Sequence, residues 1–235
     1  SNDPVAPVDP VVPIGGTATA GCAHLVRSPY MLGIGGYILL MTIASTFLYF
    51  TQLQIVDAMG GSTDEQTRLF ATVNLASQGA TLVLQLLVTA SLLRVAGTGW
   101  TLAALPLISI VAFGVLLVSP VFLTIVVAQA AFNAGRFAFA KPARETLFTV
   151  LPREDRYKSK AIIDTFVYRA GDVLGAAGIM GTQKFAPLLA SRAIGATVAS
   201  AAALAAPLGL IWILLAFWLG GQRRHRAETM AFESE

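Results

Sequence analysis

Long apolar stretches separated by short polar loops dominate the chain after residue 28. About six of these stretches have the length of a membrane-spanning helix, because about 20 apolar residues cross the hydrocarbon core of a bilayer. The second stretch is the most polar, but it is long enough to span if its polar side chains face a bundle or a cavity. The six stretches run near residues 30–56, 66–95, 100–118, 120–148, 158–182 and 193–220. This pattern predicts an all-α polytopic membrane protein with six transmembrane helices.

The composition agrees with this prediction. Of the 235 residues, 55% are hydrophobic and 12% are charged, and the mean hydropathy is +0.70. Soluble domains contain roughly 25% charged residues, so we expect an integral protein of the lipid bilayer. One cysteine, Cys22, allows neither an internal disulfide nor a cysteine metal cluster, and His24 and His225 lie at membrane edges. We expect no metal site, no cofactor and, with a net charge of +3, no nucleic-acid partner.

The chain divides into three parts. Residues 1–25 are rich in Pro, Ala and Val without helical periodicity, which is typical of a flexible linker. No charged n-region precedes an apolar h-region there, so a signal peptide is not expected. Residues 26–222 form the predicted six-helix transmembrane bundle, and residues 223–235 form a cytoplasmic tail.

Loop charges predict how the bundle is oriented, because Lys and Arg concentrate on the cytoplasmic side. One set of helix ends carries roughly nine cations, whereas the other carries about three beside Asp57, Asp64 and Glu65. Both termini are therefore predicted to be cytoplasmic, in agreement with an even number of helices. The first set comprises Arg27, Arg94, Arg153, Arg156, Lys158, Lys160, Arg223, Arg224 and Arg226, and the second comprises Arg68, Lys184 and Arg192.

The first and fourth stretches begin alike, with "SPYMLGI" at Ser28-Pro29 and "SPVFLTI" at Ser119-Pro120. Two three-helix units that start with the same Ser-Pro dipeptide and cross the membrane in opposite directions are the pattern of an inverted 3+3 repeat.

Ionisable side chains concentrate in the fourth and fifth stretches. Placing one ionisable side chain at membrane depth costs a few kcal/mol, so such residues are functional candidates. The fourth stretch carries Arg136, Lys141, Arg144 and Glu145, and the fifth carries Lys160, Asp164, Arg169 and Asp172. A water-filled cavity with an excess of cations suits an anionic substrate, and its carboxylates would carry protons or gate it.

Helical spacing places several of these residues on shared faces. At about 100° per residue, one stripe contains Lys160, Asp164, Tyr168 and Asp172. Gly171, Gly175 and Gly178 lie close to this stripe, so another helix is expected to approach closely there. Arg136 and Arg144 share a face of the fourth helix, which Pro142 is expected to kink.

A structural interpretation stays open beside the functional one. Lys141 and Glu145 are i, i+4, and Arg169 and Asp172 are i, i+3, so each pair would neutralise itself within one helix. Arg144, Glu145 and Lys160 also lie near the cytoplasmic surface, where they would snorkel or form a closed-state gate.

Enzymatic signatures are not found, so we do not expect an enzyme. The chain has no HExxH motif and no GxxxxGK[ST] motif, and neither histidine is placed for an intramembrane serine protease. The glycines of "LGIGGY", at positions 33, 35 and 36, are interpreted as packing or flexibility. The PxDxxK signature of the six-helix mitochondrial carriers is also missing.

The segment "KPARETLFTVLPREDRYKSKAIIDTFVYRAGDVLG", residues 141–175, resembles the nucleotide-exchange family (ATP/ADP translocase, NTP/NDP antiporter) of the major facilitator superfamily. That family has a K-P-x-[RK]-E start, a short charged loop and a K-x-K-A-x-I-D helix, and the entry "LVRSPYMLGIGGYILLMTIASTFLYF" is also similar to the seventh helix of bacterial members. The matching positions are Lys141, Pro142, Arg144, Glu145, Lys158, Lys160, Ala161, Ile163 and Asp164. The chain departs from the plastid and parasite carriers at Asp172, where they have a lysine after the glycine.

The resemblance implies that the chain is the C-terminal half of a twelve-helix transporter, with its N-terminal part as the central cytoplasmic linker. Such a half needs an N-terminal six-helix half or a second copy to enclose a substrate site, and the bacterial inner membrane is the expected location.

Together these observations predict half of a secondary transporter that works by alternating access on an anionic, nucleotide-like substrate. Arg136, Lys141, Arg144 and Arg169 are the expected substrate-binding residues. Glu145, Lys160, Asp164 and Asp172 are the expected gating or proton-coupling residues. Two alternatives stay open: proton-coupled efflux of organic or amphiphilic anions, and a non-transporting membrane module that anchors or regulates a partner.

Overall fold

The computed structural model of the chain describes residues 28–87, 89–151, 156, 160–183 and 193–233. Within these ranges the chain is almost entirely helical and contains no strand. The predicted all-α class is therefore confirmed. The elements are α2 (Pro29–Met59), α3 (Thr63–Leu87), α4 (Thr89–Val118), α5 (Phe122–Gly135), η1 (Arg136–Ala140), α6 (Lys141–Phe148), η2 (Ile163–Val167), α8 (Tyr168–Gln183) and α9 (Ala193–Glu233).

Several predicted features lie outside the described residues. These are the linker at residues 1–25 with Cys22 and His24, and the loop cations Arg27, Arg153, Lys158, Lys184 and Arg192.

Four helical segments are long and apolar enough to cross a membrane within the described part of the chain. They are Pro29–Met59, Gly97–Val118, Phe122–Phe148 and Ala201–Met230. The last two show that α5, η1 and α6 form one continuous helix and that α9 carries an apolar span inside a longer helix. These segments identify an integral membrane protein with four candidate spans; α3 and the helix formed by residues 160–183 are not among them.

The junction between the second and third predicted stretches lies at Gly97. Helix α4 breaks at this residue, whose φ of 72° and ψ of 173° are not helical. A positive φ is readily adopted by glycine and only rarely by other residues. Hydropathy predicts this junction between residues 95 and 100, and the break at Gly97 starts the next apolar span.

Local sequence signals explain how α2 ends and α3 begins. Gly60 and Gly61 both have positive φ, 70° and 103°, and form the turn between the two helices. Ser62 and Glu65 then form a capping box, in which the Ser62 N–H donates to Glu65 Oε2 at 2.8 Å and the Glu65 N–H approaches Ser62 Oγ at 3.4 Å. This exchange satisfies backbone donors that the first helical turn leaves unpaired.

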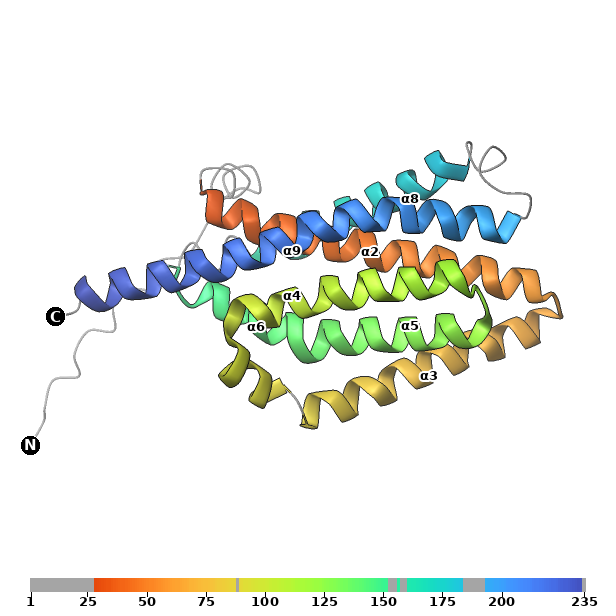
Figure 1. Cartoon of the computed structure of the whole chain (residues 1–235), viewed down its shortest axis with the longest axis horizontal. Helices are drawn as coiled ribbons and strands as arrows, with labels where there is room; N and C mark the ends of the chain where they lie inside the picture. Colours follow the sequence, from red (N-terminus) through yellow and green to blue (C-terminus); the bar gives the residue numbers. More distant parts are fainter. Residues whose placement is uncertain (1–27, 88, 152–155, 157–159, 184–192, 234–235) are drawn as a thin grey trace, which may run out of the picture.

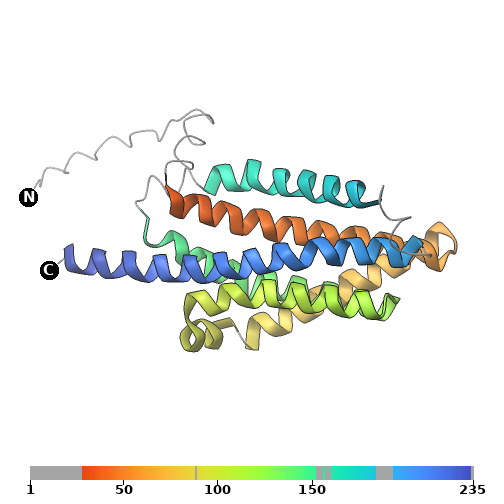
Figure 2. The same cartoon turned by 45° about the horizontal axis from the view of Figure 1, so that its top comes forward.

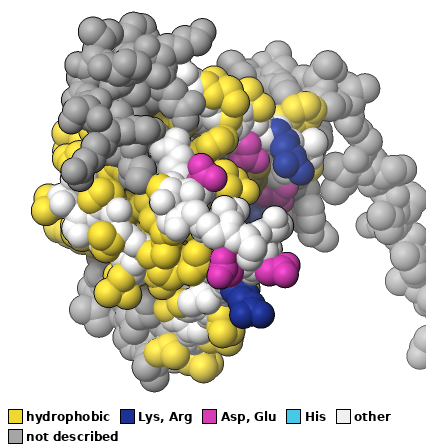
Figure 3. Space-filling model, turned by 90° about the vertical axis from the view of Figure 1, so that its right-hand side faces the viewer, with side chains coloured by type: hydrophobic (Ala, Val, Ile, Leu, Met, Phe, Trp, Pro, Cys, Tyr) yellow, Lys and Arg dark blue, Asp and Glu magenta, His cyan; other side chains and the backbone are white. Residues whose placement is uncertain are grey.

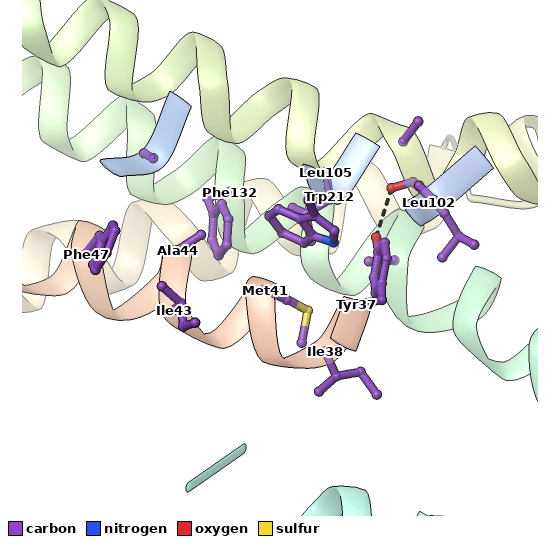
Figure 4. Packing of buried hydrophobic residues seen from close by; sticks show 14 of the residues in the cluster. Tyr37, Ile38, Met41, Ile43, Ala44, Phe47, Leu102, Leu105, Phe132 and Trp212 are labelled. Carbon is purple, nitrogen blue, oxygen red and sulfur yellow. Dashed lines mark hydrogen bonds between the residues drawn. The ribbon is translucent and has the colours of Figure 1, made fainter. Parts of the chain in front are cut away.

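Helix α2 lies at the centre of the bundle, with α8 on one side and α9 and α4 on the other (Figures 1 and 2), while α3 packs against α5. Its buried side chains meet those of α4, α5 and α9, as Figure 4 shows. Tyr37 illustrates the packing: its ring lies edge-on to Trp212, with centroids 5.4 Å apart, and its hydroxyl donates to the Leu102 carbonyl at 2.8 Å. A buried polar contact also joins α5 to α2, since Gln129 donates to Gln52 at 2.9 Å.

The two ends of the bundle differ in charge. The end at which α2 turns into α3 carries Asp57 in the last turn of α2 and Asp64 and Glu65 in the first turn of α3, and acidic side chains are visible on this end in Figure 3. The opposite end carries the described cations Arg223, Arg224 and Arg226 of α9. Helix α9 continues through these cations to Glu233, so most of the predicted tail extends this helix.

Candidate functional site

A cavity of about 240 Å³ lies between α2, the α5–η1–α6 helix and α8. Its lining residues are Tyr37, Met41, Arg136, Phe137, Ala140, Lys141, Arg144 and Tyr168. Three of the four cations predicted to bind substrate meet here, and the lining contains no carboxylate. We call this space the arginine cavity. Its position in the second half of the candidate span Phe122–Phe148 and its charge make it the candidate functional site.

A π-helical turn brings the three cations to one face. Residues five apart in an α-helix lie about 140° apart around the axis, since each residue turns it by about 100°. In η1 the Lys141 N–H donates to the Arg136 carbonyl, five residues earlier, and such a turn adds one residue to the helix. The angle between Arg136 and Lys141 therefore falls to about 40°, and that between Arg136 and Arg144 falls from about 80° to about 20°.

Pro142 follows this wide turn directly, at the start of α6. Proline has no N–H and cannot donate to the carbonyl four residues earlier, which here belongs to Ala138. The sequence predicts a kink beside this proline, and the structure has the π turn η1 at that place. Such turns occur frequently at functional sites.

A second π turn lies across the cavity. In η2 the Tyr168 N–H donates to the Ile163 carbonyl, so the regular spacing that defines the predicted stripe is interrupted between Asp164 and Tyr168. Tyr168 lines the arginine cavity, whereas Asp164 is exposed and is not part of the lining. The η1 turn thus contributes Arg136 to the cavity, and Tyr168, directly after η2, lines it from the other helix.

Arg144 and Tyr168 form the polar contact that spans the cavity. Arg144 Nη1 donates to the Tyr168 hydroxyl at 2.6 Å, so the hydroxyl proton is free to be donated elsewhere. Arg144 Nε is buried and has no hydrogen-bond acceptor among the described residues. A buried donor without a partner costs about 1–3 kcal/mol.

The other two cations rest on an aromatic ring. The Arg136 guanidinium lies 4.6 Å from the centroid of Phe137, and Lys141 Nζ lies 5.9 Å from the same centroid. Neither of them, nor Arg144, forms an ion pair with a described residue. The arginine cavity therefore holds positive charge that no neighbouring carboxylate in the described chain neutralises.

Glu145 forms an ion pair with Lys160, whereas Lys141 lines the arginine cavity. Lys160 Nζ donates to Glu145 Oε2 at 2.6 Å, joining α6 to the first turn of the helix at residues 160–183. The alternative in which Lys141 neutralises Glu145 within one helix is wrong for this reason. The pair is partly exposed, and it lies beyond the cavity toward the basic end of the bundle.

Arg169 and Asp172 lie outside the arginine cavity. They form the expected i, i+3 pair, although at 3.8 Å and with side chains that are 84% and 52% exposed. Asp172 also accepts from the Thr46 hydroxyl at 3.4 Å. With Asp164, they place three ionisable groups on the uncovered surface of the η2–α8 helix.

The glycines of α8 pack closely on α2, as expected. A Cβ added at Gly171 would lie 2.6 Å from Thr42 Cβ, and one added at Gly175 would lie 2.8 Å from Thr46 Cβ. This close approach fixes the distance between α2 and α8, and thereby the width of the arginine cavity between Tyr37 and Tyr168.

Three side chains at the basic end hold the C-terminal carbonyls of α6. Tyr30 donates to Leu147 O at 2.9 Å. Two arginines contribute as well: Arg223 Nε donates to Thr146 O at 3.2 Å, and Arg156 Nε donates to Phe148 O at 3.0 Å. Cationic donors at a helix C-terminus satisfy carbonyls that lack intrahelical partners and favour the helix dipole.

Two tyrosines of this region were assigned no role by the sequence. Tyr168 stands in the predicted stripe without a function, and Tyr37 carries no signal beyond its place in an apolar helix. An aromatic hydroxyl within a membrane span has to find a partner, which is the signal that would have singled out both residues.

In comparisons with known proteins, no family model, no curated protein and no solved structure matches the chain.

Proposed function

We propose that the chain is one half of a secondary transporter that binds an anionic small molecule in the arginine cavity and moves it by alternating access. The observation that carries this proposal is the convergence of Arg136, Lys141 and Arg144 on a cavity without a carboxylate, with the buried Arg144 Nε unpartnered in the described chain. A site with three cationic donors inside a membrane protein is suited to a phosphate or carboxylate group.

Within this proposal the cations have distinct roles. Arg144 would donate to the anion and use Tyr168 to hold its guanidinium plane, while Arg136 and Lys141 would contribute charge from the same face of the helix. The hydroxyl of Tyr168 would donate a further hydrogen bond. A nucleoside di- or triphosphate is the substrate class that the resemblance of residues 141–175 to the nucleotide-exchange family favours.

A second half is required because of the charges on the outer surface of η2 and α8. Asp164, Arg169 and Asp172 are exposed. An ionisable side chain that faces lipid tails costs a few kcal/mol. We propose that an N-terminal six-helix half, or a second copy of this chain, covers that surface with a water-filled path between. Arg169 would then meet the substrate from the boundary between the halves.

The membrane arrangement belongs to the same proposal. Helix α3 has 25 residues, which at about 1.5 Å each reach about 37 Å and exceed the roughly 30 Å hydrocarbon core. With α3 and the helix at residues 160–183 also crossing, the chain would have six spans in an inverted 3+3 repeat. Both termini would lie in the cytoplasm, as in the C-terminal half of a major facilitator protein of a bacterial inner membrane.

The Lys160–Glu145 pair is the proposed cytoplasmic gate. It joins the two helices that contribute cations and Tyr168 to the cavity, so separating these helices toward the cytoplasm requires that it break. An exposed pair is worth only about 0–1 kcal/mol, which suits a gate that opens and closes readily.

Proton-coupled efflux of organic anions is the second candidate, and Asp164 and Asp172 favour it. Carboxylates on a surface that faces a water-filled path could exchange protons between the two sides. Transport of labelled nucleotide in proteoliposomes separates the two candidates, because exchange requires nucleotide on the opposite side, whereas coupled efflux requires a proton gradient.

The binding step can be tested on the purified chain in an uncharged detergent by thermal unfolding. A bound anion at about 100 times its Kd stabilises the folded state by about 2.7 kcal/mol, a rise in Tm of roughly 5–10 °C for a chain of this size. We expect ATP or ADP to produce this rise and uncharged nucleosides to have no effect.

Substitutions in the arginine cavity test whether the anion raises Tm by binding there. Arg136→Gln and Arg144→Gln should each remove most of the shift, and the control Arg68→Gln, an exposed cation on α3, should preserve it. The proposal is wrong if no nucleotide, phosphate or carboxylate anion raises Tm, or if both cavity variants respond as the unmodified chain does.

A further inference from the structure

A second polar pocket, of about 490 Å³, lies at the basic end of the bundle where α9 passes the break in α4. It shares no lining residue with the arginine cavity. Its lining consists of Gly97, Thr98, Gly99, Trp100, Phe217, Gly220, Gly221, Arg223 and Arg224. We call it the α4–α9 pocket.

Glycines make much of its wall out of backbone. A Cβ added at Gly220 would lie 2.5 Å from the Cα of Gly99, so the two helices touch backbone to backbone at this point. Around Gly221 no atom lies within 4 Å of an added Cβ, and the space of the pocket begins there. The break at Gly97 lies at this wall.

The charge in the α4–α9 pocket is positive and unpaired. Arg223 Nη1 donates to the Thr98 hydroxyl at 3.2 Å, which orients its guanidinium along the wall, and Arg224 is exposed beside it. No carboxylate lines the pocket, and neither arginine forms an ion pair with a described residue. Two guanidinium groups and a hydroxyl form a set of donors that matches the oxygens of a phosphate group.

The pocket lies where the protein passes from lipid to water. The apolar span Gly97–Val118 begins at it, and α9 changes there from the apolar "LLAFWL" to the basic "QRRHR". Trp100 is 61% exposed and packs edge-on against Phe217, with ring centroids 4.8 Å apart. Tryptophan favours the headgroup level of a bilayer, and basic pockets between transmembrane helices bind acidic lipid headgroups.

We infer that the α4–α9 pocket binds the phosphate group of an anionic phospholipid, with Arg223, Arg224 and Thr98 around the phosphate and the first methylenes of the lipid over Trp100 and Phe217. Such a lipid would join α4 to α9 at the basic end and complete the contacts that Arg223 makes with Thr98 and Thr146 O. This inference is independent of the proposed transport function.

The test is thermal unfolding of the full chain in an uncharged detergent, with dioleoylphosphatidylglycerol, dioleoylphosphatidylcholine or inorganic phosphate added in separate titrations. We expect the anionic lipid to raise Tm and the zwitterionic lipid and free phosphate to leave it within error. Equal stabilisation by the two lipids, or by free phosphate at matched concentration, overturns the assignment to an anionic lipid. No response to any of the three overturns the site.

Two variants locate the effect. Arg224→Gln should weaken the apparent affinity for phosphatidylglycerol by roughly fivefold or more, as expected for a lost charge-assisted contact. Gly221→Leu should abolish the lipid-induced shift by filling the pocket without changing its charge. Arg68→Gln, which removes one cation at the opposite end, is the control and should keep the full shift. The inference fails if both pocket variants behave as this control does.

Discussion

Arg144 donates to the hydroxyl of Tyr168 at 2.6 Å, and this contact connects the two π-helical turns that flank the arginine cavity. Each residue follows a π turn by few positions, Arg144 after η1 and Tyr168 directly after η2. The contact therefore depends on two departures from regular helix at once. Because Nε of the same arginine has no acceptor in the described chain, the pair holds a guanidinium in place without using all of its donors.

Replacing Tyr168 by Phe tests whether this arrangement serves an anion. The substitution removes the hydroxyl that accepts from Arg144, so Tm without ligand should fall by the equivalent of one hydrogen bond. It also removes the hydrogen bond that this hydroxyl is proposed to donate to the anion. Losing one hydrogen bond to a charged group costs about 1.5–3 kcal/mol, and the affinity for nucleotide should fall roughly tenfold or more. The measurement is the nucleotide dependence of Tm. Tyr49→Phe, at an exposed tyrosine of α2, is the control, and an equal effect of the two variants would contradict the role of Tyr168.

Close packing of α8 on α2 leads to a prediction about stability. Gly171→Ala should lower Tm although alanine favours helix by about 1 kcal/mol over glycine, because its Cβ would lie 2.6 Å from Thr42 Cβ and overpacking typically costs about 1–3 kcal/mol. Gly79→Ala, on α3, has nothing within 4 Å of its added Cβ and should keep or raise Tm. A rise in Tm for both variants would show that α2 and α8 are not in contact at Gly171.

Part of the architecture follows from the sequence on physical grounds. Apolar length predicts the helices that start at Pro29 and Phe122, and the small residues of α8 predict the close approach of another helix, since these signals are local. The structure identifies that helix as α2. The charges of the fourth stretch predict a cationic cavity, which Arg136, Lys141 and Arg144 line. These properties need only helical periodicity and the cost of burying charge.

The rest depends on details that periodicity does not contain. A uniform turn of about 100° per residue places Asp164 and Tyr168 on one stripe, but only Tyr168 lines the arginine cavity. The pairing of Glu145 with Lys160 instead of Lys141 depends on the approach of two helices that are joined by a loop.

The ion pair between Lys160 and Glu145 offers a test of gating by charge reversal. Glu145→Lys places two cations together at the proposed gate and should lower the rate of nucleotide exchange in proteoliposomes several-fold. The double variant Glu145→Lys, Lys160→Glu restores opposite charges and should recover most of the rate. Since exposed pairs contribute about 0–1 kcal/mol, Tm should change by less than about 4 °C in either case.

Recovery in the double variant distinguishes the gate from a substrate contact. A side chain that binds the anion directly would not be rescued by exchanging it with its partner, because the cation would then stand in the wrong helix. Unchanged exchange in Glu145→Lys would contradict gating altogether.

Pro142 gives the last prediction, because it lies beside the turn that gathers the cations. Pro142→Ala supplies the missing N–H, which can donate to the Ala138 carbonyl and favour a regular α-helix in place of η1. A regular helix would rotate Lys141 by about 100° relative to Arg136. We therefore expect Tm without ligand to stay the same or rise, while the stabilisation by nucleotide falls to less than half. Ala143→Gly, at the next position, weakens the helix without supplying this donor, and should lower Tm while leaving the relative response to nucleotide intact. If Pro142→Ala keeps the full nucleotide response, the convergence of cations does not depend on the proline, and η1 has another cause.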